Sequence, residues 1–311
     1  MEIFSTIKET KECLMSLKKE GKTIGFVPTM GALHRGHASL LERGEKENDI
    51  SVSSIFVNPI QFNDKKDLEK YPRTISEDII KLKSAHCDVL FAPSVEEMYP
   101  AAPIPSFCDS LKEPEKRRQK KTEKNNPFDL GNLDNVMEGK QRSGHFQGVC
   151  VVVKKLFDII QPDKAYFGEK DFQQLAIIKH MVQTLSVPVE IVPCPTVREP
   201  DGLAMSSRNT FLNPDERKNA ALIYKALMEV KNLTSPPNPS SPKGKESMKV
   251  ADLKKWVEQK INENPFLKLE YFEVVNSETL ASVKDWNEAI PLRACIAVKA
   301  GAIRLIDNIA L

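Results

Sequence analysis

The sequence predicts an α/β protein in which a parallel sheet domain precedes a smaller α+β domain. Up to about residue 196, short apolar runs alternate with stretches of helical periodicity. Beyond that point two helical stretches come first, and three strand-like runs follow them. Alternating strands and helices build a parallel sheet covered by helices, whereas helices followed by strands favour a separate unit. We therefore expect a Rossmann-like domain over residues 1–196 and an α+β domain over residues 197–311.

In chain order, each expected element rests on its own pattern. Apolar runs of strand length cover residues 23–27, 50–57, 88–91, 164–167 and 189–192, and helical patterns cover residues 34–44, 77–85, 146–160 and 172–185. In the second domain, we expect helices over 213–233 and 250–262 and strands over 269–275, 294–299 and 303–309. The last two strands meet at Ala300-Gly301, which predicts a hairpin. Ligands of such parallel sheets bind at the carboxyl ends of the strands.

Composition excludes several classes of protein. The 311 residues are 41% hydrophobic and 28% charged, with a net charge of +2, as in an ordinary globular protein without a strong preference for nucleic acid or membranes. No apolar segment approaches the roughly 20 residues that cross a bilayer. The first residues have neither signal-peptide nor transit-peptide character. The six cysteines form no Cys-x-x-Cys pair, so we expect reduced thiols and a cytoplasmic location.

The first candidate site follows the strand at 23–27. Residues 28–37 read Pro-Thr-Met-Gly-Ala-Leu-His-Arg-Gly-His, and we expect both His34 and His37 in the first turn of a helix. There, main-chain N–H groups without intrahelical partners and the positive end of the helix dipole favour a phosphate chain. An imidazole can also donate hydrogen bonds to phosphoryl oxygens. The alternative is a pair of surface histidines near a helix start.

Two further constellations also come directly after predicted strands. Asn58 and Gln61 offer carboxamides suited to a hydroxy acid or an amino acid, although Asn58-Pro59 is equally typical of a turn. In Phe-Gly-Glu-Lys-Asp-Phe-Gln-Gln (167–174), Lys170 stands where a helix opens, and Gln174 follows one turn later. A solvated Glu-Lys-Asp turn is the alternative there.

Two loops complete the candidate residues. In 201–209, Asp-Gly-Leu-Ala-Met-Ser-Ser-Arg-Asn, two hydroxyls and a guanidinium are suited to a polyphosphate and its leaving pyrophosphate. Serine-rich loops are common, so we count this loop as a candidate site only because it follows the histidine motif in a chain of this architecture. His145 lies between two glycines at a helix start, where we expect a capping loop first and a substrate contact second.

Six segments together resemble the pantoate–β-alanine ligases, or pantothenate synthetases, of the nucleotidylyltransferase superfamily. These segments are 28–37, 55–62 (Ile-Phe-Val-Asn-Pro-Ile-Gln-Phe), 71–74 (Tyr-Pro-Arg-Thr), 167–174, 197–209 and 304–308 (Arg-Leu-Ile-Asp-Asn), in order over nearly the whole chain. The resemblance implies that ATP, with Mg²⁺ carried on its phosphates, and pantoate form pantoyl adenylate and pyrophosphate. The amine of β-alanine then displaces AMP, giving pantothenate for coenzyme A biosynthesis.

The resemblance also implies roles for single residues. His37 is the proton donor, with His34 beside it on the phosphates, and Gln61 holds both pantoate and β-alanine while Gln174 holds pantoate. Lys170, Ser206 and Arg208 meet the charge that develops on pyrophosphate. The ATP site comprises Met30, Gly31, Ala32, Leu33, His34, Arg35, Gly36, His37, Gly168, Glu169, Lys170, Asp171, Val197, Met205, Ser206, Ser207 and Arg208. The C-terminal domain is expected to act as a lid, and the family implies a homodimer.

Two inserts depart from the compact family pattern. The insert at 110–142 carries a basic run from Lys112 to Lys124, expected to be a solvated, mobile loop, with nucleic-acid contact as the alternative. The Pro/Ser-rich stretch at 234–248 is expected to be a flexible loop. Three rival functions stay open: a tRNA-ligating enzyme, which needs a tRNA-binding module, a simple nucleotidylyltransferase, which does not need the carboxamides, and a non-catalytic nucleotide-binding protein.

Overall fold

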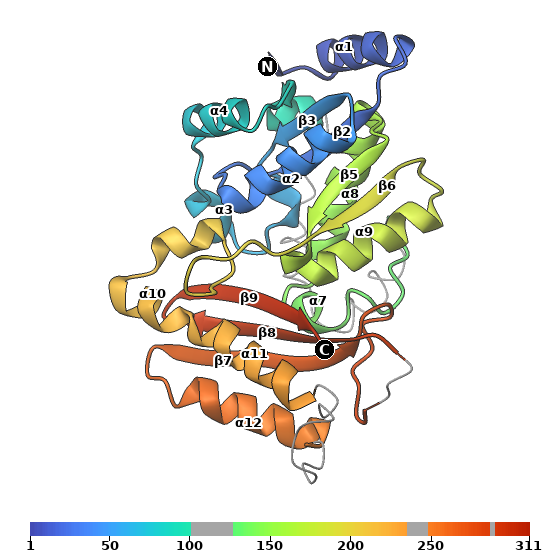
Figure 1. The fold of residues 1–311 in the computed structure, drawn as a ribbon. Coiled ribbons are helices and arrows are strands. Elements are labelled where there is room, and N and C mark those ends of the chain that lie inside the picture. Colours follow the sequence, from blue (N-terminus) through green and yellow to red (C-terminus); the bar gives the residue numbers. More distant parts are fainter. Residues whose placement is uncertain (101–126, 235–247, 287–289) are drawn as a thin grey trace, which may run out of the picture. The chain divides into compact units, whose positions relative to one another are not determined.

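The computed structural model describes residues 1–100, 127–234, 248–286 and 290–311 (Figure 1). The basic run from Lys112 to Lys124 and nearly all of the Pro/Ser-rich loop fall outside these residues. By their contacts the residues form two compact units. Unit 1 comprises Met1–Glu169 and Gln173–Pro195, and unit 2 comprises Lys170–Phe172 and Thr196–Leu311.

Unit 1 is built on a six-stranded sheet in which all neighbouring strands are parallel (Figure 1). The strand order is β1 (Glu2–Phe4), β4 (Val89–Phe91), β3 (Ile50–Ile55), β2 (Ile24–Thr29), β5 (Lys164–Gly168) and β6 (Glu190–Cys194). The predicted parallel sheet and its five predicted strands are confirmed. The short edge strand β1 was not predicted, because three residues are too few to show a period.

The helices of unit 1 follow the predicted alternation, with one helix of 13 residues near the N-terminus and several short helices that were not predicted. They are α1 (Ile7–Lys19), α2 (Arg35–Glu47), α3 (Lys65–Lys70), α4 (Ile75–Ser84), α5 (Val95–Met98), α7 (Met137–Gln141), α8 (His145–Ile160) and α9 (Phe172–Thr184, whose first residue belongs to unit 2), with the 3-10 helices η1 (Pro59–Gln61) and η3 (Glu169–Asp171, whose last two residues belong to unit 2). Phe26 on β2 packs in a core with residues of α8 and α9. Its neighbour Val27 packs with residues of α2 and α4, because successive strand residues face opposite sides of a sheet.

The strand order reverses between β2 and β5. From β2 the chain adds β3 and β4 on one side, and from β5 it adds β6 on the other. Such a switch point leaves a crevice at the carboxyl ends of the two central strands, where ligands bind. The segment that follows Thr29 and the turn at Gly168 therefore leave the sheet at neighbouring positions of this edge.

Unit 2 places helices against a three-stranded antiparallel sheet. The helices are α10 (Pro214–Ala220), α11 (Leu222–Thr234) and α12 (Val250–Asn262), and the sheet order is β7 (Leu267–Asn276), β8 (Leu292–Ala300) and β9 (Ile303–Ala310). The predicted hairpin is confirmed, since Ala300 pairs with Ile303. Asn213 caps α10 in a reciprocal pair with Glu216. The prediction of a single helix over 213–233 is wrong, because the helix breaks at Ala221. Ala221 keeps αR dihedral angles, so the spacing of apolar residues continues across the break.

Five cysteines lie among the described residues, and all are free. Burial raises the pKa of the Cys87 and Cys150 thiols to about 12. No helix within the described ranges is long and apolar enough to cross a membrane.

Candidate active site

A buried carboxylate holds the loop that follows β2. Asp78 on α4 is 0% exposed and accepts the main-chain N–H of Ala32 at 2.9 Å and that of Leu33 at 2.8 Å. Thr74 donates a third hydrogen bond to it at 3.0 Å. Gly31 and Ala32 both have positive φ, at 82° and 49°, a conformation that a non-glycine residue adopts at a cost unless its surroundings fix it. The shape of this loop is therefore set by Asp78.

The two histidines of the motif cap α2 together. α2 begins at Arg35, so His34 is the N-cap residue and not part of the first turn, which corrects the prediction. The Nδ1 atom of His34 accepts the N–H of Gly36 at 3.1 Å, and that of His37 accepts the N–H of His34 at 3.3 Å. The ring centroids lie 4.1 Å apart. The N–H of Gly36, expected to lack an intrahelical partner, is thus bonded to an imidazole.

This capping selects the tautomer of each neutral ring. Each Nδ1 accepts a main-chain hydrogen bond, so the proton of each neutral ring lies on Nε2. Both histidines are thereby prepared as Nε2–H donors at the carboxyl end of β2. The predicted chemistry, donation to phosphoryl oxygens, is compatible with this tautomer.

Gln61 is fixed by its surroundings. Its Nε2 donates to the Met30 sulfur at 3.0 Å, its Oε1 accepts from Asn58 at 3.1 Å, and its main-chain oxygen lies 2.8 Å from Nδ1 of His145. Gly148 on α8 passes so close that a Cβ there would lie 2.8 Å from Gln61 Cα. The predicted carboxamide and the predicted histidine loop therefore meet through Met30.

Asn58 and His145 support Gln61. The amide of Asn58 is 0% exposed, donates to the Gly148 carbonyl at 3.1 Å and accepts from the Tyr99 hydroxyl at 2.9 Å. With three hydrogen bonds inside unit 1, this amide orients its neighbour. His145 begins α8, and its imidazole contacts the main-chain oxygen of Gln61.

At the end of β5 the prediction needs a correction. Lys170 and Asp171 do not open an α-helix: they lie in η3, and α9 begins at Phe172. Beside Gly168, no heavy atom of the described residues lies within 4 Å of the position that a Cβ would take. Gln174 is half-buried, whereas its neighbour Gln173 is 4% exposed and bonded to main-chain atoms of 133–138.

In unit 2 the loop that carries Ser206 and Ser207 follows directly after a small hairpin. The N–H of Met205 donates to the Val197 carbonyl at 3.0 Å, which places these two predicted ATP-site residues opposite each other. Ser206 then caps the 3-10 helix η4 (Ser207–Phe211) by accepting the N–H of Arg208 at 3.3 Å. Lys170 belongs to unit 2 by its contacts, and its ammonium lies 3.7 Å from Asp171.

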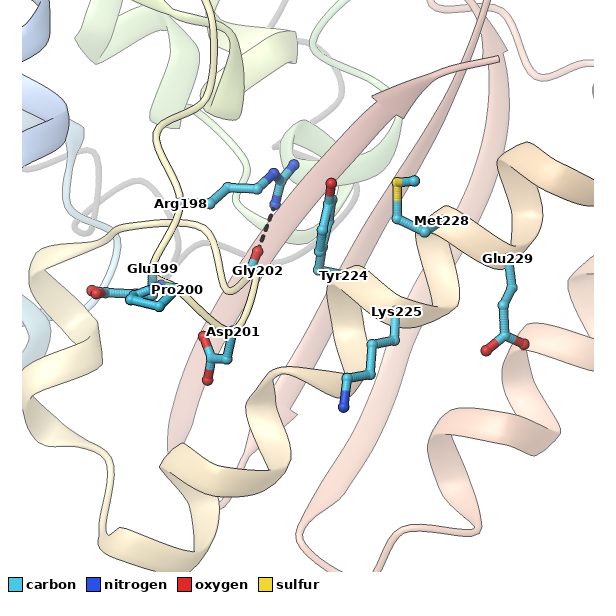
Figure 2. Close-up of a pocket in the computed structure, with 9 residues that line it drawn as sticks. All are labelled: Arg198, Glu199, Pro200, Asp201, Gly202, Tyr224, Lys225, Met228 and Glu229. Carbon is cyan, nitrogen blue, oxygen red and sulfur yellow. Dashed lines mark hydrogen bonds between the residues drawn. The ribbon is translucent and has the colours of Figure 1, made fainter.

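A pocket in unit 2 lies beside this hairpin and was not predicted (Figure 2). Its residues are Arg198, Glu199, Pro200, Asp201, Gly202, Tyr224, Lys225, Met228 and Glu229. Three of its charged side chains have partners outside the pocket lining: Arg198 pairs with Asp307, Asp201 with Arg217 and Glu229 with Lys260. We assign it no ligand.

The structure thus divides the predicted residues into two sets. Unit 1 holds the set at the carboxyl ends of β2 and β5 together with Gln61 and Gln174: Met30, Gly31, Ala32, Leu33, His34, Arg35, Gly36, His37, Gln61, Gly168, Glu169 and Gln174. Unit 2 holds Lys170, Asp171, Val197, Met205, Ser206, Ser207 and Arg208. Within the described chain, no group of three or more His, Cys, Asp or Glu side chains is placed to hold a metal ion.

Comparison with known proteins decides among the enzyme classes that share these features. The family model for pantoate-beta-alanine ligase matches residues 2–310. The chain belongs to the pantoate-beta-alanine ligase family. Its relatives include proteins named pantothenate synthetase from Porphyromonas gingivalis strain W83, 47% identical, and Caldicellulosiruptor saccharolyticus, 45% identical, each over 99% of both chains.

Solved structures of pantoate-beta-alanine ligases are also similar. A pantothenate synthetase from Thermus thermophilus shares 39% identity over 99% of both chains, with a TM-score of 0.80. The Francisella tularensis ligase, described as complexed with beta-gamma ATP and beta-alanine, shares 35% identity over 100% of this chain and 97% of its own, with a TM-score of 0.72. The resemblance drawn from the six segments is thereby confirmed.

Proposed function

We propose that this chain joins pantoate to β-alanine through a pantoyl adenylate, with release of pyrophosphate and AMP. It is an ATP-dependent ligase of the pantoate-beta-alanine ligase family. The observation that carries the choice of reaction is the contact between Gln61 and Met30, at 3.0 Å. This contact joins a carboxamide suited to an acid substrate to the loop that we assign to ATP, a combination that simple nucleotidyl transfer does not require.

In the first half-reaction, a carboxylate oxygen of pantoate attacks the α-phosphorus of ATP, and negative charge moves onto the departing pyrophosphate. His37 and His34 are proposed to donate from Nε2 to the phosphates. Lys170, Ser206 and Arg208 are proposed to meet the charge on the leaving group. Groups that already point at the developing charge stabilise the transition state more than the ground state.

In the second half-reaction, the amine of β-alanine attacks the acyl carbon, and AMP leaves. Gln61 is proposed to hold both pantoate and β-alanine, and Gln174 to hold pantoate. Unit 1 then supplies most of the ATP site and the pantoate site, and unit 2 acts as a lid over them. Mg²⁺ is proposed to arrive on the ATP phosphates, where it offsets their charge. We also propose a homodimer in the cytoplasm.

The proposal is tested by pyrophosphate release from Mg-ATP with a panel of hydroxy acids, without β-alanine. We expect about one equivalent of pyrophosphate per site with pantoate, and continuous turnover only when β-alanine is added. Release with every acid, or release without any acid, contradicts the assignment to pantoate.

A further inference from the structure

Two consecutive polar residues of β9 are buried in unit 2. Asp307 is 4% exposed and Asn308 is 5% exposed. Consecutive residues of a strand point to opposite faces of the sheet. A buried acid and a buried amide are costly unless hydrogen-bonded. Both lie in the segment 304–308, which is part of the family resemblance but carries none of the predicted site residues.

On one face, Asp307 holds the base of the hairpin that carries Val197 and Met205. Both its oxygens accept from the Arg198 guanidinium, at 2.6 and 3.0 Å. That guanidinium also donates to the Gly202 carbonyl at 3.1 Å, across the hairpin (Figure 2). It stacks 4.0 Å from the Tyr224 ring centroid. A bidentate pair with a 2% exposed carboxylate side chain fixes direction as well as distance.

On the other face, Asn308 holds the main chain of Lys170. Its Nδ2 donates to the Lys170 carbonyl at 2.9 Å, and its Oδ1 accepts from Arg293 at 2.6 Å. Arg293 in turn lies 4.1 Å from the ring centroid of Phe172. One amide thereby fixes the segment that carries the lysine.

The two anchors are linked directly, because the N–H of Asn308 donates to Oδ1 of Asp307 at 2.8 Å. We propose that Asp307 and Asn308 are positioning residues. They hold the hairpin of Val197 and Met205 and the main chain of Lys170 in the positions that are needed to bind one and the same nucleotide. This inference rests on the proposed function for the roles of Lys170, Val197 and Met205. It assigns neither residue a contact with substrate.

The two anchors have different expected signatures. Asn308 acts through Lys170, which we assign to the pyrophosphate, so Asn308→Ala should slow adenylate formation and spare the reaction of supplied pantoyl adenylate with β-alanine. Asp307 acts through the hairpin of Val197 and Met205, which are not among the residues assigned to the leaving pyrophosphate, so within this inference they hold the part of ATP that stays in the adenylate. Asp307→Asn should therefore slow both half-reactions. A general loss of packing does not separate the half-reactions in this way.

The decisive experiment is a double-mutant cycle of Asn308→Ala with Lys170→Ala, read by calorimetric titration with a β,γ-methylene analogue of ATP. We expect Asn308→Ala to weaken binding on the order of tenfold in the parent, the scale of one lost hydrogen bond, and by less than about twofold when Lys170 is already alanine. Equal weakening in both backgrounds overturns the role of Asn308.

Glu270→Gln is the matched control. Glu270 is paired with Lys299 and Arg304 in the same sheet, so its loss destabilises unit 2 without touching either anchored segment. If Glu270→Gln weakens binding of the analogue as much as Asn308→Ala does, the loss of binding in Asn308→Ala comes from lower stability, and the inference fails. Should Asp307→Asn not fold, Arg198→Lys keeps the charge and loses the bidentate geometry, and it must slow both half-reactions. A parent that binds the analogue but makes no pantothenate contradicts the proposed function, while the cycle still decides the inference.

Discussion

The Nδ1 atom of His37 accepts the main-chain N–H of His34 at 3.3 Å. The bond gives His37 two separable contributions, one to the start of α2 and one to chemistry. His37→Ala should lose about 1 kcal/mol of stability, as for a lost cap, and on the order of 10²-fold in pantoyl adenylate formation.

His37→Asn separates these contributions, because its carboxamide oxygen can still accept the His34 N–H. We expect the asparagine variant to unfold near the temperature of the parent while its pantoate-dependent pyrophosphate release stays low. An alanine variant with near-normal adenylation refutes the role given to His37.

Lys170→Ala separates the half-reactions. Its ammonium is assigned to the leaving pyrophosphate, so pyrophosphate release from ATP and pantoate should fall strongly. Pure pantoyl adenylate supplied to the same variant should still react with β-alanine at the rate of the parent, because pyrophosphate has already left. Equal damage to both steps would show that Lys170 orders the site instead.

Gly148→Ala tests whether the close packing of α8 against η1 holds Gln61 in place for the acid substrates. A Cβ there would lie 2.5 Å from the Ile60 carbonyl oxygen and 2.8 Å from Gln61 Cα, so Gly148→Ala must displace η1. We expect the KM values for pantoate and β-alanine to rise on the order of tenfold, the scale of a hydrogen bond lost on binding, with the KM for ATP little changed.

The control for Gly148→Ala is Gly21→Ala. Gly21 has a φ of +80° and open space around it, so alanine there costs stability through backbone strain alone. Steady-state kinetics of both variants should show changed KM values only for Gly148→Ala. Unchanged values in that variant, despite lower stability, would remove Gln61 from the acid site.

The lowered pKa of Glu270 predicts that part of the free energy of unfolding is lost at acid pH. Burial acts to raise its pKa, but hydrogen bonds with Lys299 and Arg304 together outweigh burial and lower the pKa below its ordinary value. A lowered folded-state pKa gives stability that is present above the unfolded pKa of about 4.3 and is lost as the pH falls through the folded value.

Glu270→Gln should therefore be less stable than the parent at pH 7, and the difference should shrink as the pH falls below the unfolded pKa of about 4.3 and through the lower folded-state pKa, where the parent carboxyl becomes neutral. Denaturant unfolding over a pH series measures this. A difference that is constant from pH 7 to pH 3 contradicts the account.

Much of the fold was readable because burial leaves a period in the sequence. The strand at 23–27 and the helix at 146–160 are apolar enough to be recognised alone. The break at Ala221 left no trace in that period, since the apolar spacing continues across it. The β1 strand pairs with β4, which lies far along the chain, and the sequence of three residues alone does not indicate this pairing.

For the candidate site, the motifs located the loops but not what holds them. Asp78 looks like an ordinary acidic residue of a first helical turn, yet it lies buried and binds two N–H groups 45 and 46 residues away in the sequence. Asn58 and Gln61 looked equivalent, and only packing shows that Asn58 supports Gln61. Such long-range hydrogen bonds depend on the tertiary fold, which local periodicity does not encode.

The central claim is that pantoate is activated as an acyl adenylate. It is tested most directly with pantoate labelled with ¹⁸O in its carboxyl group, Mg-ATP and β-alanine, with mass spectrometry of all phosphate-containing products. If the carboxylate attacks the α-phosphorus and β-alanine then displaces AMP, each AMP carries one ¹⁸O from pantoate and pyrophosphate carries none. Label in inorganic phosphate or pyrophosphate, or AMP without label, would contradict the account.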